Sequence, residues 1–162
     1  MRRRYYKRTA NRDKYSVEHT TIRSPEFDAW PATTTARQWA INILPPTDIE
    51  GMRKVKHLTL TFSNFGGVTE QYPIFYAVVY VPQGYDVNEL YIPAIGQANN
   101  LYEPNQFVMS SGVLDFSGGP LRIRSKLSRN LNSGDRIALA LATTLTSGGP
   151  ILSEVTYAIT LQ

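Results

Sequence analysis

A succession of short strand-like segments, each closed by Pro, Gly, Asn or Ser, runs through almost the whole chain. In these segments β-branched and aromatic residues are common and often alternate with polar ones, as in half-buried strands. No segment predicts a helix longer than a turn or two. About eight strands are therefore expected, at residues 15–23, 37–44, 53–62, 74–81, 107–116, 121–127, 137–145 and 154–161.

Eight antiparallel strands in two packed sheets are the strand count of a jelly roll. With 162 residues, the chain is long enough for one domain with a substantial core. The sequence therefore predicts an all-β fold, an eight-stranded antiparallel jelly-roll β-sandwich over residues 15–162. A β-sandwich of the immunoglobulin kind is the alternative.

The segment 53–62 carries a further detail, because its apolar residues change parity along the strand. Val55 occupies an odd position, whereas Leu58 and the apolar residues after it occupy even positions. A β-bulge near Lys56 and His57 keeps both sets on one face of the strand. We therefore expect a bulge at that point.

The segment 74–81 is apolar at both parities, which predicts a central strand covered on both faces. Residues 82–104, which follow it, form the longest irregular region, with one helical turn expected over 87–91. Loops of this length in compact domains are usually functional, and many contact partners. Aromatic residues in or beside this loop are candidates for subunit contact, with local packing as the alternative: Tyr85, Tyr91, Tyr102 and Phe107.

The composition and motifs exclude several classes of function. Without cysteine the chain has no disulfide, no thiolate metal site and no cysteine nucleophile. The motifs HExxH, GxSxG, GxGxxG and the P-loop are absent, and His19 and His57 lie in predicted strands without a partner motif. No apolar run reaches the roughly 18–20 residues of a membrane helix. We expect no enzymatic activity, no metal, no cofactor and no membrane insertion.

The positive charge is concentrated at the N-terminus. The whole chain carries a net charge of +4, and residues 1–14 contain seven Lys or Arg and one Asp, which gives +6. The remaining residues therefore carry −2. The chain thus divides into a basic N-terminal arm, residues 1–14, and a nearly neutral body, residues 15–162.

An arm of this composition suits a polyanion. Like-charge repulsion and a lack of aliphatic residues keep it from forming a core, and cationic groups bind phosphates with release of counterions. Tyrosine rings among the cations can stack on unpaired bases. A nuclear localisation signal is a compatible second use, and a solvated tail is the alternative. The residues predicted to bind single-stranded nucleic acid are Arg2, Arg3, Arg4, Tyr5, Tyr6, Lys7, Arg8, Arg12 and Lys14.

Two further groups of basic residues lie in predicted strands, one at the start of 53–62 and one along a face of 121–127. If both strands belong to the sheet that faces a packaged polyanion, they form a second basic layer. The alternative is a solvated strand face whose charges protect a sheet edge. The residues are Arg53, Lys54, Lys56, Arg122, Arg124 and Lys126.

Three stretches together resemble the capsid proteins of circoviruses and related circular, Rep-encoding single-stranded DNA viruses. They are the basic arm leading into YSVEHTTIRSP at residues 15–25, INILPP at 41–46, and RKVKHLTL at 53–60. Their order and spacing match the start of that coat protein, over about the first third of the chain.

This resemblance implies a viral capsid protein with a jelly-roll fold. Sixty copies would close a small icosahedral T=1 shell, with the arm turned toward a packaged single-stranded DNA genome, or toward host RNA in recombinant virus-like particles. It also implies localisation in the virion, assembly in the host nucleus, and outer loops that bind acidic host glycans. A non-viral β-sandwich that binds single-stranded nucleic acid is the alternative.

Overall fold

The computed structural model describes residues 15–32, 37–64, 74–85, 107–115, 120–125, 128–145 and 148–161. The arm and the predicted helical turn over 87–91 lie outside the described residues. Within the described part of the chain, no helix is long and apolar enough to cross a membrane. The elements are β1 (Ser16–Arg23), η1 (Phe27–Ala29, a 3-10 helix), β2 (Arg37–Leu44), β3 (Arg53–Asn64), β4 (Ile74–Val81), β5 (Phe107–Leu114), β6 (Leu121–Arg124), β7 (Arg129–Leu131), β8 (Arg136–Thr143) and β9 (Ile151–Leu161).

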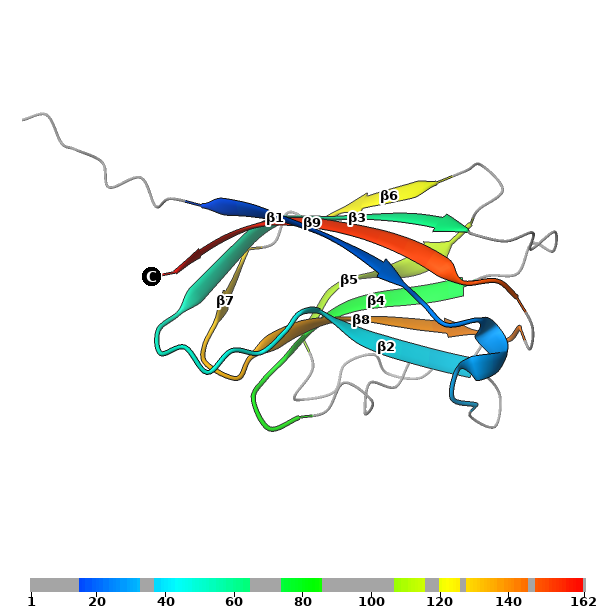
Figure 1. Ribbon diagram of the computed structural model, residues 1–162, viewed down its shortest axis with the longest axis horizontal. Coiled ribbons are helices and arrows are strands. Elements are labelled where there is room, and N and C mark those ends of the chain that lie inside the picture. Colours follow the sequence, from blue (N-terminus) through cyan, green and yellow to red (C-terminus); the bar gives the residue numbers. More distant parts are fainter. Residues whose placement is uncertain are drawn as a thin grey trace, which may run out of the picture.

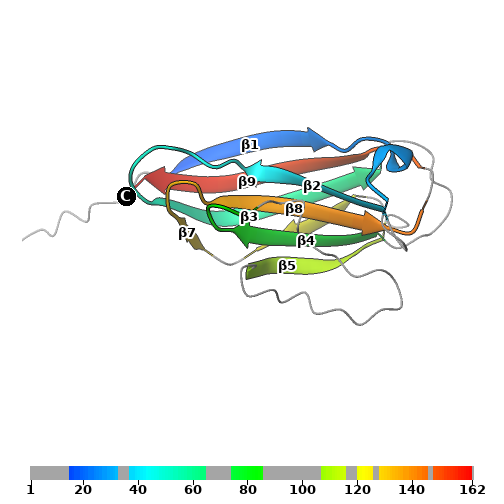
Figure 2. The ribbon, with the colours of Figure 1, turned by 90° about the horizontal axis from the view of Figure 1, so that it is seen from below.

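The strands form two antiparallel sheets that pack face to face (Figure 1 and Figure 2). One sheet has the order β1-β9-β3-β6, with β7 also paired to β3, and the other has the order β2-β8-β4-β5. Since β6 and β7 pair with successive parts of β3, together they fill one strand position. The two sheets therefore provide eight strand positions.

This strand order is that of a jelly roll. The first strand lies beside the last, and the second strand lies beside β8 in the opposite sheet. In an immunoglobulin sandwich the first two strands share a sheet, whereas β1 and β2 lie in different sheets here. The predicted jelly roll is confirmed, and the immunoglobulin alternative is wrong.

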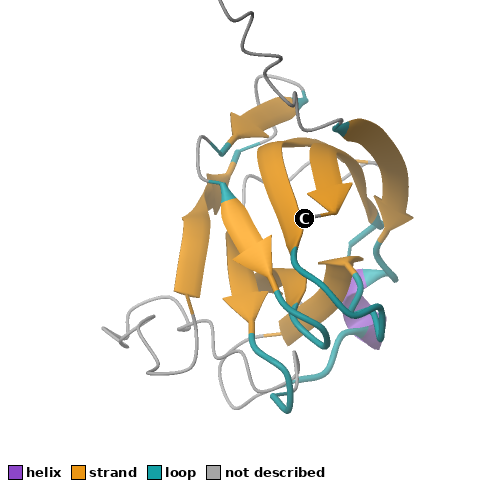
Figure 3. Cartoon of the chain, turned by 90° about the vertical axis from the view of Figure 1, so that its left-hand side faces the viewer, coloured by secondary structure: helices purple, strands orange, loops and turns teal. Residues whose placement is uncertain are grey.

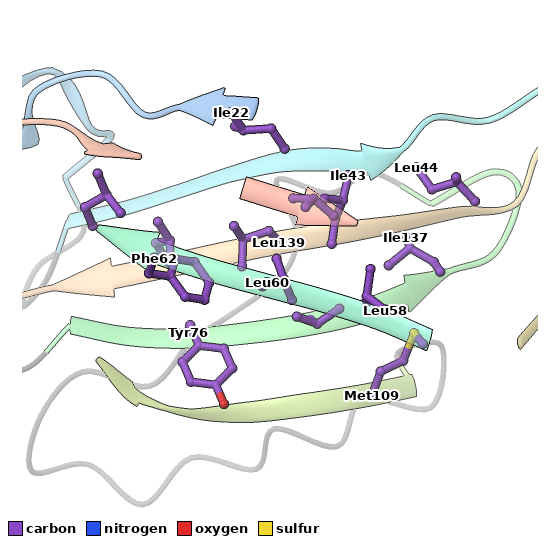
Figure 4. Close-up of a cluster of buried hydrophobic side chains, with 14 of the residues drawn as sticks. Ile22, Ile43, Leu44, Leu58, Leu60, Phe62, Tyr76, Met109, Ile137 and Leu139 are labelled. Carbon is purple, nitrogen blue, oxygen red and sulfur yellow. The ribbon is translucent and has the colours of Figure 1, made fainter. Parts of the chain in front are cut away.

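The core lies between the two sheets and is built from one face of each (Figure 4). In β3 this face carries Leu58, Leu60 and Phe62, which are at most 2% exposed. Phe62 packs against Tyr76 of β4, with ring centroids 5.7 Å apart. Complete burial of a large apolar side chain stabilises a fold by roughly 1.5–3 kcal/mol. The apolar residues at alternate positions of β3 therefore stabilise the packing of the two sheets.

The predicted bulge in β3 is confirmed. The register of β3 against β9 shifts between Lys56 and Thr59, and His57 has a φ of 56°. This left-handed backbone is uncommon outside glycine, although histidine is among the residues that adopt it more readily. The extra residue allows Val55 and Leu58 to face the core together, which explains the change of parity in the sequence.

β4 is a central strand, as predicted, because it pairs with β8 on one side and with β5 on the other. Both of its faces are buried. The face turned away from the main core forms a second cluster of small side chains with β8, namely Ala77, Val79, Val81, Ala138, Ala140 and Ala142. The segment predicted at 137–145 is therefore a strand, and its alanines lie on the outer face of the sheet.

The region 121–131 differs from the prediction. One strand was expected over 121–127, but β6 ends at Arg124 and a further strand, β7, begins at Arg129. β6 pairs with β3 after the bulge and β7 pairs with β3 before it. The bulge at His57 thus interrupts the partner strand, since the two halves of β3 present different registers.

Three aromatic side chains pack together at one end of the sandwich, and we call this cluster the aromatic plug: Phe27, Trp30 and Trp39. Phe27 begins the short helix η1 and Trp30 directly follows it, and both are 1% exposed. Their rings meet edge to face at 4.8 Å, and Trp30 stacks on Trp39 of β2 at 6.0 Å. The indole Nε1 of Trp30 donates to the carbonyl of Pro25 at 3.1 Å. The plug joins the chain after β1 to the start of β2.

Gly148 is the close neighbour of this plug, so its replacement by alanine should destabilise the fold. A Cβ at this position would lie 2.5 Å from the Cδ2 atom of Phe27, and overpacking of this kind costs about 1–3 kcal/mol. We expect urea unfolding to show that loss for Gly148→Ala. In a double-mutant cycle with Phe27→Leu, which shortens the ring, the combined loss should be smaller than the sum; an additive result would contradict the contact.

Candidate nucleic-acid interface

The outward face of the β1-β9-β3-β6 sheet gathers basic side chains from β3 and β6. Val55, Leu58 and Leu60 point into the core, so Lys54 and Lys56 point outward. On the neighbouring strand Arg124 pairs with Thr59 and Arg122 pairs with Thr61. These two arginines are exposed on the same outward face, and the lysines are half-buried there.

The same face continues across β9 to β1. Thr59 and His19 both pair with Thr156, and Thr61 and Thr21 both pair with Glu154. Cross-strand partners point to the same side of a sheet, so β1 contributes His19, Thr21 and Arg23. We call this surface the basic face and define its charged residues as Arg23, Lys54, Lys56, Arg122, Arg124 and Glu154.

The basic face has a net charge of +4 over the described residues, from five cations and one carboxylate, with its histidines neutral. Edge protection explains charges on β6, which is an edge strand. It does not explain Lys54, which pairs with Asn130 of β7 on one side and with Thr160 of β9 on the other. Lys54 therefore presents its cation for a reason other than the protection of an edge.

The opposite outer face, that of the β2-β8-β4-β5 sheet, has a different chemistry. Its outward positions in the described strands carry Ala, Val, Phe, Ser, Gln and Asn, and Arg136 is the one charged residue among them. Most of those on β4 and β8 are buried. The Arg136 guanidinium donates to the carbonyl of Tyr85. Among the described strands, the outward-pointing cations are thus concentrated on the β1-β9-β3-β6 sheet.

The basic face lies beside the point where the arm joins the body. Tyr15, which directly follows the arm, lies next to Lys56, and the ammonium of Lys56 is 4.7 Å from the centroid of the Tyr15 ring. This distance is within the range of a cation–π interaction. The contact ties the start of β1 to β3 and places Tyr15, the first residue after the arm, at the edge of the basic face.

Arg53 does not belong to the basic face, which corrects the predicted group. It has the same parity as Val55, points inward and is 8% exposed. Its guanidinium donates from Nη1 to the carbonyl of Pro45 at 3.0 Å and from Nη2 to the carbonyl of Asp135 at 2.9 Å. Burial lowers the pKa of Arg53. Its role is structural.

The turn between β7 and β8 lies at the end of the sandwich that faces the viewer in Figure 3, and a buried carboxylate, that of Asp135, directly precedes β8. Asp135 is 4% exposed, and its Oδ2 accepts from the Tyr80 hydroxyl at 2.8 Å and from the amide of Asn132 at 2.8 Å. Its Oδ1 accepts from the amide of Gln83 at 3.1 Å. Burial and the hydrogen bond to Asp135 raise the pKa of Tyr80 to about 12. This cluster connects β4, β8 and the start of β3, the strand that carries Lys54.

Of the remaining residues singled out in the sequence, two lie in the described part of the chain and the others lie outside it. Tyr85 is 41% exposed just after β4, which leaves its ring available for contact. Phe107 begins β5, where it pairs with Tyr80, but its side chain is not among those described. The others lie outside the described residues: Tyr91, Tyr102, Lys126 and the nine arm residues Arg2, Arg3, Arg4, Tyr5, Tyr6, Lys7, Arg8, Arg12 and Lys14. No group of three or more His, Cys, Asp or Glu that could hold a metal occurs in the described part of the chain.

No protein-family model and no curated protein matches the chain. Among solved structures it is similar to the BFDV capsid protein in a decameric crystal structure, with a TM-score of 0.46, 8% identity, and coverage of 92% of this chain and 99% of that one. It is also similar to Desmodium yellow mottle tymovirus, with a TM-score of 0.39, 13% identity, and coverage of 92% and 82%.

A third similar structure is an aminopeptidase from a marine sediment Thaumarchaeota archaeon, with a TM-score of 0.32, 11% identity, and coverage of 91% of this chain and 33% of that one. At these TM-scores and identities the likenesses decide neither family nor function. The fold assignment therefore rests on the strand order of the chain itself.

Proposed function

We propose that the chain is a viral capsid protein of the circovirus-like kind, which assembles into a closed icosahedral shell and packages single-stranded DNA. The observation that carries this proposal is the cationic face of the jelly roll. Five cations gather on one sheet face, and Tyr15, the residue that directly follows the arm, touches that face. A wall protein that packages a polyanion needs such a cationic side.

The amount of charge fits a packaging role. Sixty arms at +6 supply about +360, and sixty basic faces at +4 add about +240, against one phosphate charge per nucleotide. The arms alone neutralise only some hundreds of nucleotides. The basic face therefore supplies a substantial second share, as Lys54, Lys56, Arg122 and Arg124 lie on it together.

The proposed shell has sixty copies in a T=1 arrangement, with residues 1–14 as its inner arm and residues 15–162 as its wall. The aromatic candidates Tyr85, Tyr91, Tyr102 and Phe107 supply subunit contacts, because interfaces are enriched in tyrosine and phenylalanine. The same proposal places the assembly of the shell in the host nucleus and the assembled protein in the virion. It also assigns the outer loops to the binding of acidic host glycans. It includes no catalytic step.

Deletion of residues 2–14 tests the packaging half of the proposal. We expect the truncated protein still to form shells, because the fold and its contacts lie in the body, but the nucleic-acid content of the purified particles should fall sharply. The ratio of ultraviolet absorbance of nucleic acid to that of protein measures this content. An unchanged ratio would defeat the role of the arm.

The competing function is a non-viral β-sandwich that binds single-stranded nucleic acid, since the basic face could serve such a protein equally well. The two functions differ in assembly. A single-strand binder remains a monomer or a small oligomer at every salt concentration, whereas a coat protein forms large particles of uniform size. Light scattering over a range of salt concentrations separates them.

A further inference from the structure

The edge strand β5 differs from the strands at the other edges of the two sheets (Figure 2). At the edge beside β3, β6 and β7 have four and three residues and contain three arginines. β1 carries a glutamate and an arginine, and β2 begins with Arg37, which forms a bridge with Ala32. β5 has eight residues, and none of them is charged or a proline.

The composition of β5 leaves its edge open to another strand. Among the described strands only β4 pairs with β5, so the other edge presents backbone groups that a further strand can pair with. Proteins usually prevent such pairing with short strands, charged side chains or proline, and β5 has none of these. Ser111 is exposed, and Val113 is 47% exposed. This edge therefore suits an uncharged strand as its partner.

The β5 strand of a second copy is such a partner, because β5 is symmetric about its own middle. The register of β5 against β4 shifts between Ser110 and Val108, so Met109 is the extra residue of a bulge. Without this extra residue, Ser111 is the middle position of the strand. In an antiparallel pair of two β5 strands centred there, Ser111 lies opposite the second copy's Ser111, and Val113 lies opposite the second copy's Val108.

The opposed side chains in this register also point to the same side of the sheet. Val108, Ser111 and Val113 pair with residues of β4 that lie in or against the cluster on the outer face, and cross-strand partners share a face. A shift by one residue would instead oppose outward and inward side chains. The centred register therefore places serine against serine and valine against valine on one face.

We propose that the edge of β5 joins two copies of this chain by a β5–β5 pair about a two-fold axis. This inference rests on the proposed function, since it names one contact by which the shell assembles. The axis runs perpendicular to the joined sheet, because opposed side chains stay on one side. Both basic faces, which belong to the other sheet, then lie together on the opposite side of the dimer. Symmetric dimer contacts of this kind are the commonest in oligomers.

A single cysteine at the axis tests the contact. The chain has no cysteine, so Ser111→Cys supplies one thiol per copy. Opposed Cα atoms of an antiparallel pair are about 4.5–5.5 Å apart, which lies within the range of about 4.4–6.8 Å found in disulfides. With oxidised glutathione as the oxidant, we expect most of the assembled protein to run as a dimer in non-reducing gel electrophoresis, and as a monomer after reduction.

The matched control is Ser16→Cys, which places the thiol at an exposed position of β1, an edge strand of the other sheet. This variant should run as a monomer under the same oxidising conditions. Urea unfolding of both variants should match the parent, because both serines are exposed. A missing dimer band in folded Ser111→Cys then reports on the contact.

Two charged variants test the same contact without a covalent bond. Ser111→Lys opposes like charges across the axis, which destabilises a strand pair, and Ser111→Glu does the same. Each variant alone should lose most of the particles that the parent forms. An equal mixture of the two should recover them, because every axis can then pair lysine with glutamate.

The failure of this inference differs from the failure of the proposed function. Particles of Ser111→Cys that yield no disulfide-linked dimer overturn the β5 contact and leave the proposed function standing. The contact is also overturned if the charged variants assemble like the parent. A parent that forms no particles at any salt concentration overturns the proposed function, and the disulfide of Ser111→Cys then decides the contact by itself.

Discussion

Replacement of Asp135 by alanine is expected to destabilise the fold by about 3–5 kcal/mol. The carboxylate is buried and accepts hydrogen bonds from the Tyr80 hydroxyl and from the amides of Gln83 and Asn132. Alanine would leave these donors without their partner and would leave the buried guanidinium of Arg53 without its nearby anion. Removal of one member of such a cluster costs far more than the net value of the cluster itself.

Urea unfolding measures this loss, with Asp48→Ala as the control. Asp48 is an exposed carboxylate in the loop before β3, and its replacement should change stability by less than about 0.5 kcal/mol. In folded Asp135→Ala the pKa of Tyr80 should also fall from about 12 toward its ordinary value, which the ultraviolet absorbance of the phenolate reports. A decrease in the free energy of unfolding below about 1 kcal/mol would show that the hydrogen bonds of Asp135 contribute little to the stability of the fold.

The second large effect is expected at the basic face. Simultaneous replacement of Lys54, Lys56, Arg122 and Arg124 by glutamine removes four charges from positions that are exposed or half-buried, so the fold should be kept. The salt slope for a single-stranded oligonucleotide should fall by about 2.8, and affinity in about 0.15 M salt should fall about a hundredfold. Fluorescence anisotropy over a salt series gives both values.

The matched control exchanges the same four residues between lysine and arginine, which keeps the charge and changes the side chains. We expect its salt slope to equal that of the parent, because counterion release depends on charge. If the glutamine variant keeps the parent slope, the nucleic acid does not touch this face and the arm acts alone.

The fold could be predicted in considerable detail, because its determinants are local. The bounds of β2 and β4 follow from apolar runs closed by proline or glycine, and the bulge at His57 follows from the change of parity after Val55. β7 could not be predicted in the same way. It exists because β3 is long enough to pair with two successive segments on either side of its bulge, and this pairing joins residues distant in the sequence.

The candidate site was only partly predictable. Arg122 and Arg124 were correctly expected on one face, but the sequence could not show that β6 lies beside β3. The inward direction of Arg53 could have been read from its shared parity with Val55. The role of Asp135 could not be predicted, because its partners Tyr80 and Gln83 lie 55 and 52 residues away in the sequence.

The central claim is that a jelly-roll wall with one cationic side encloses single-stranded nucleic acid. Electron microscopy of the purified, untruncated protein, combined with its ultraviolet absorbance ratio, tests this claim most directly. The account predicts closed particles of uniform size that contain nucleic acid. A protein that stays monomeric or dimeric and free of nucleic acid at every salt concentration would contradict it.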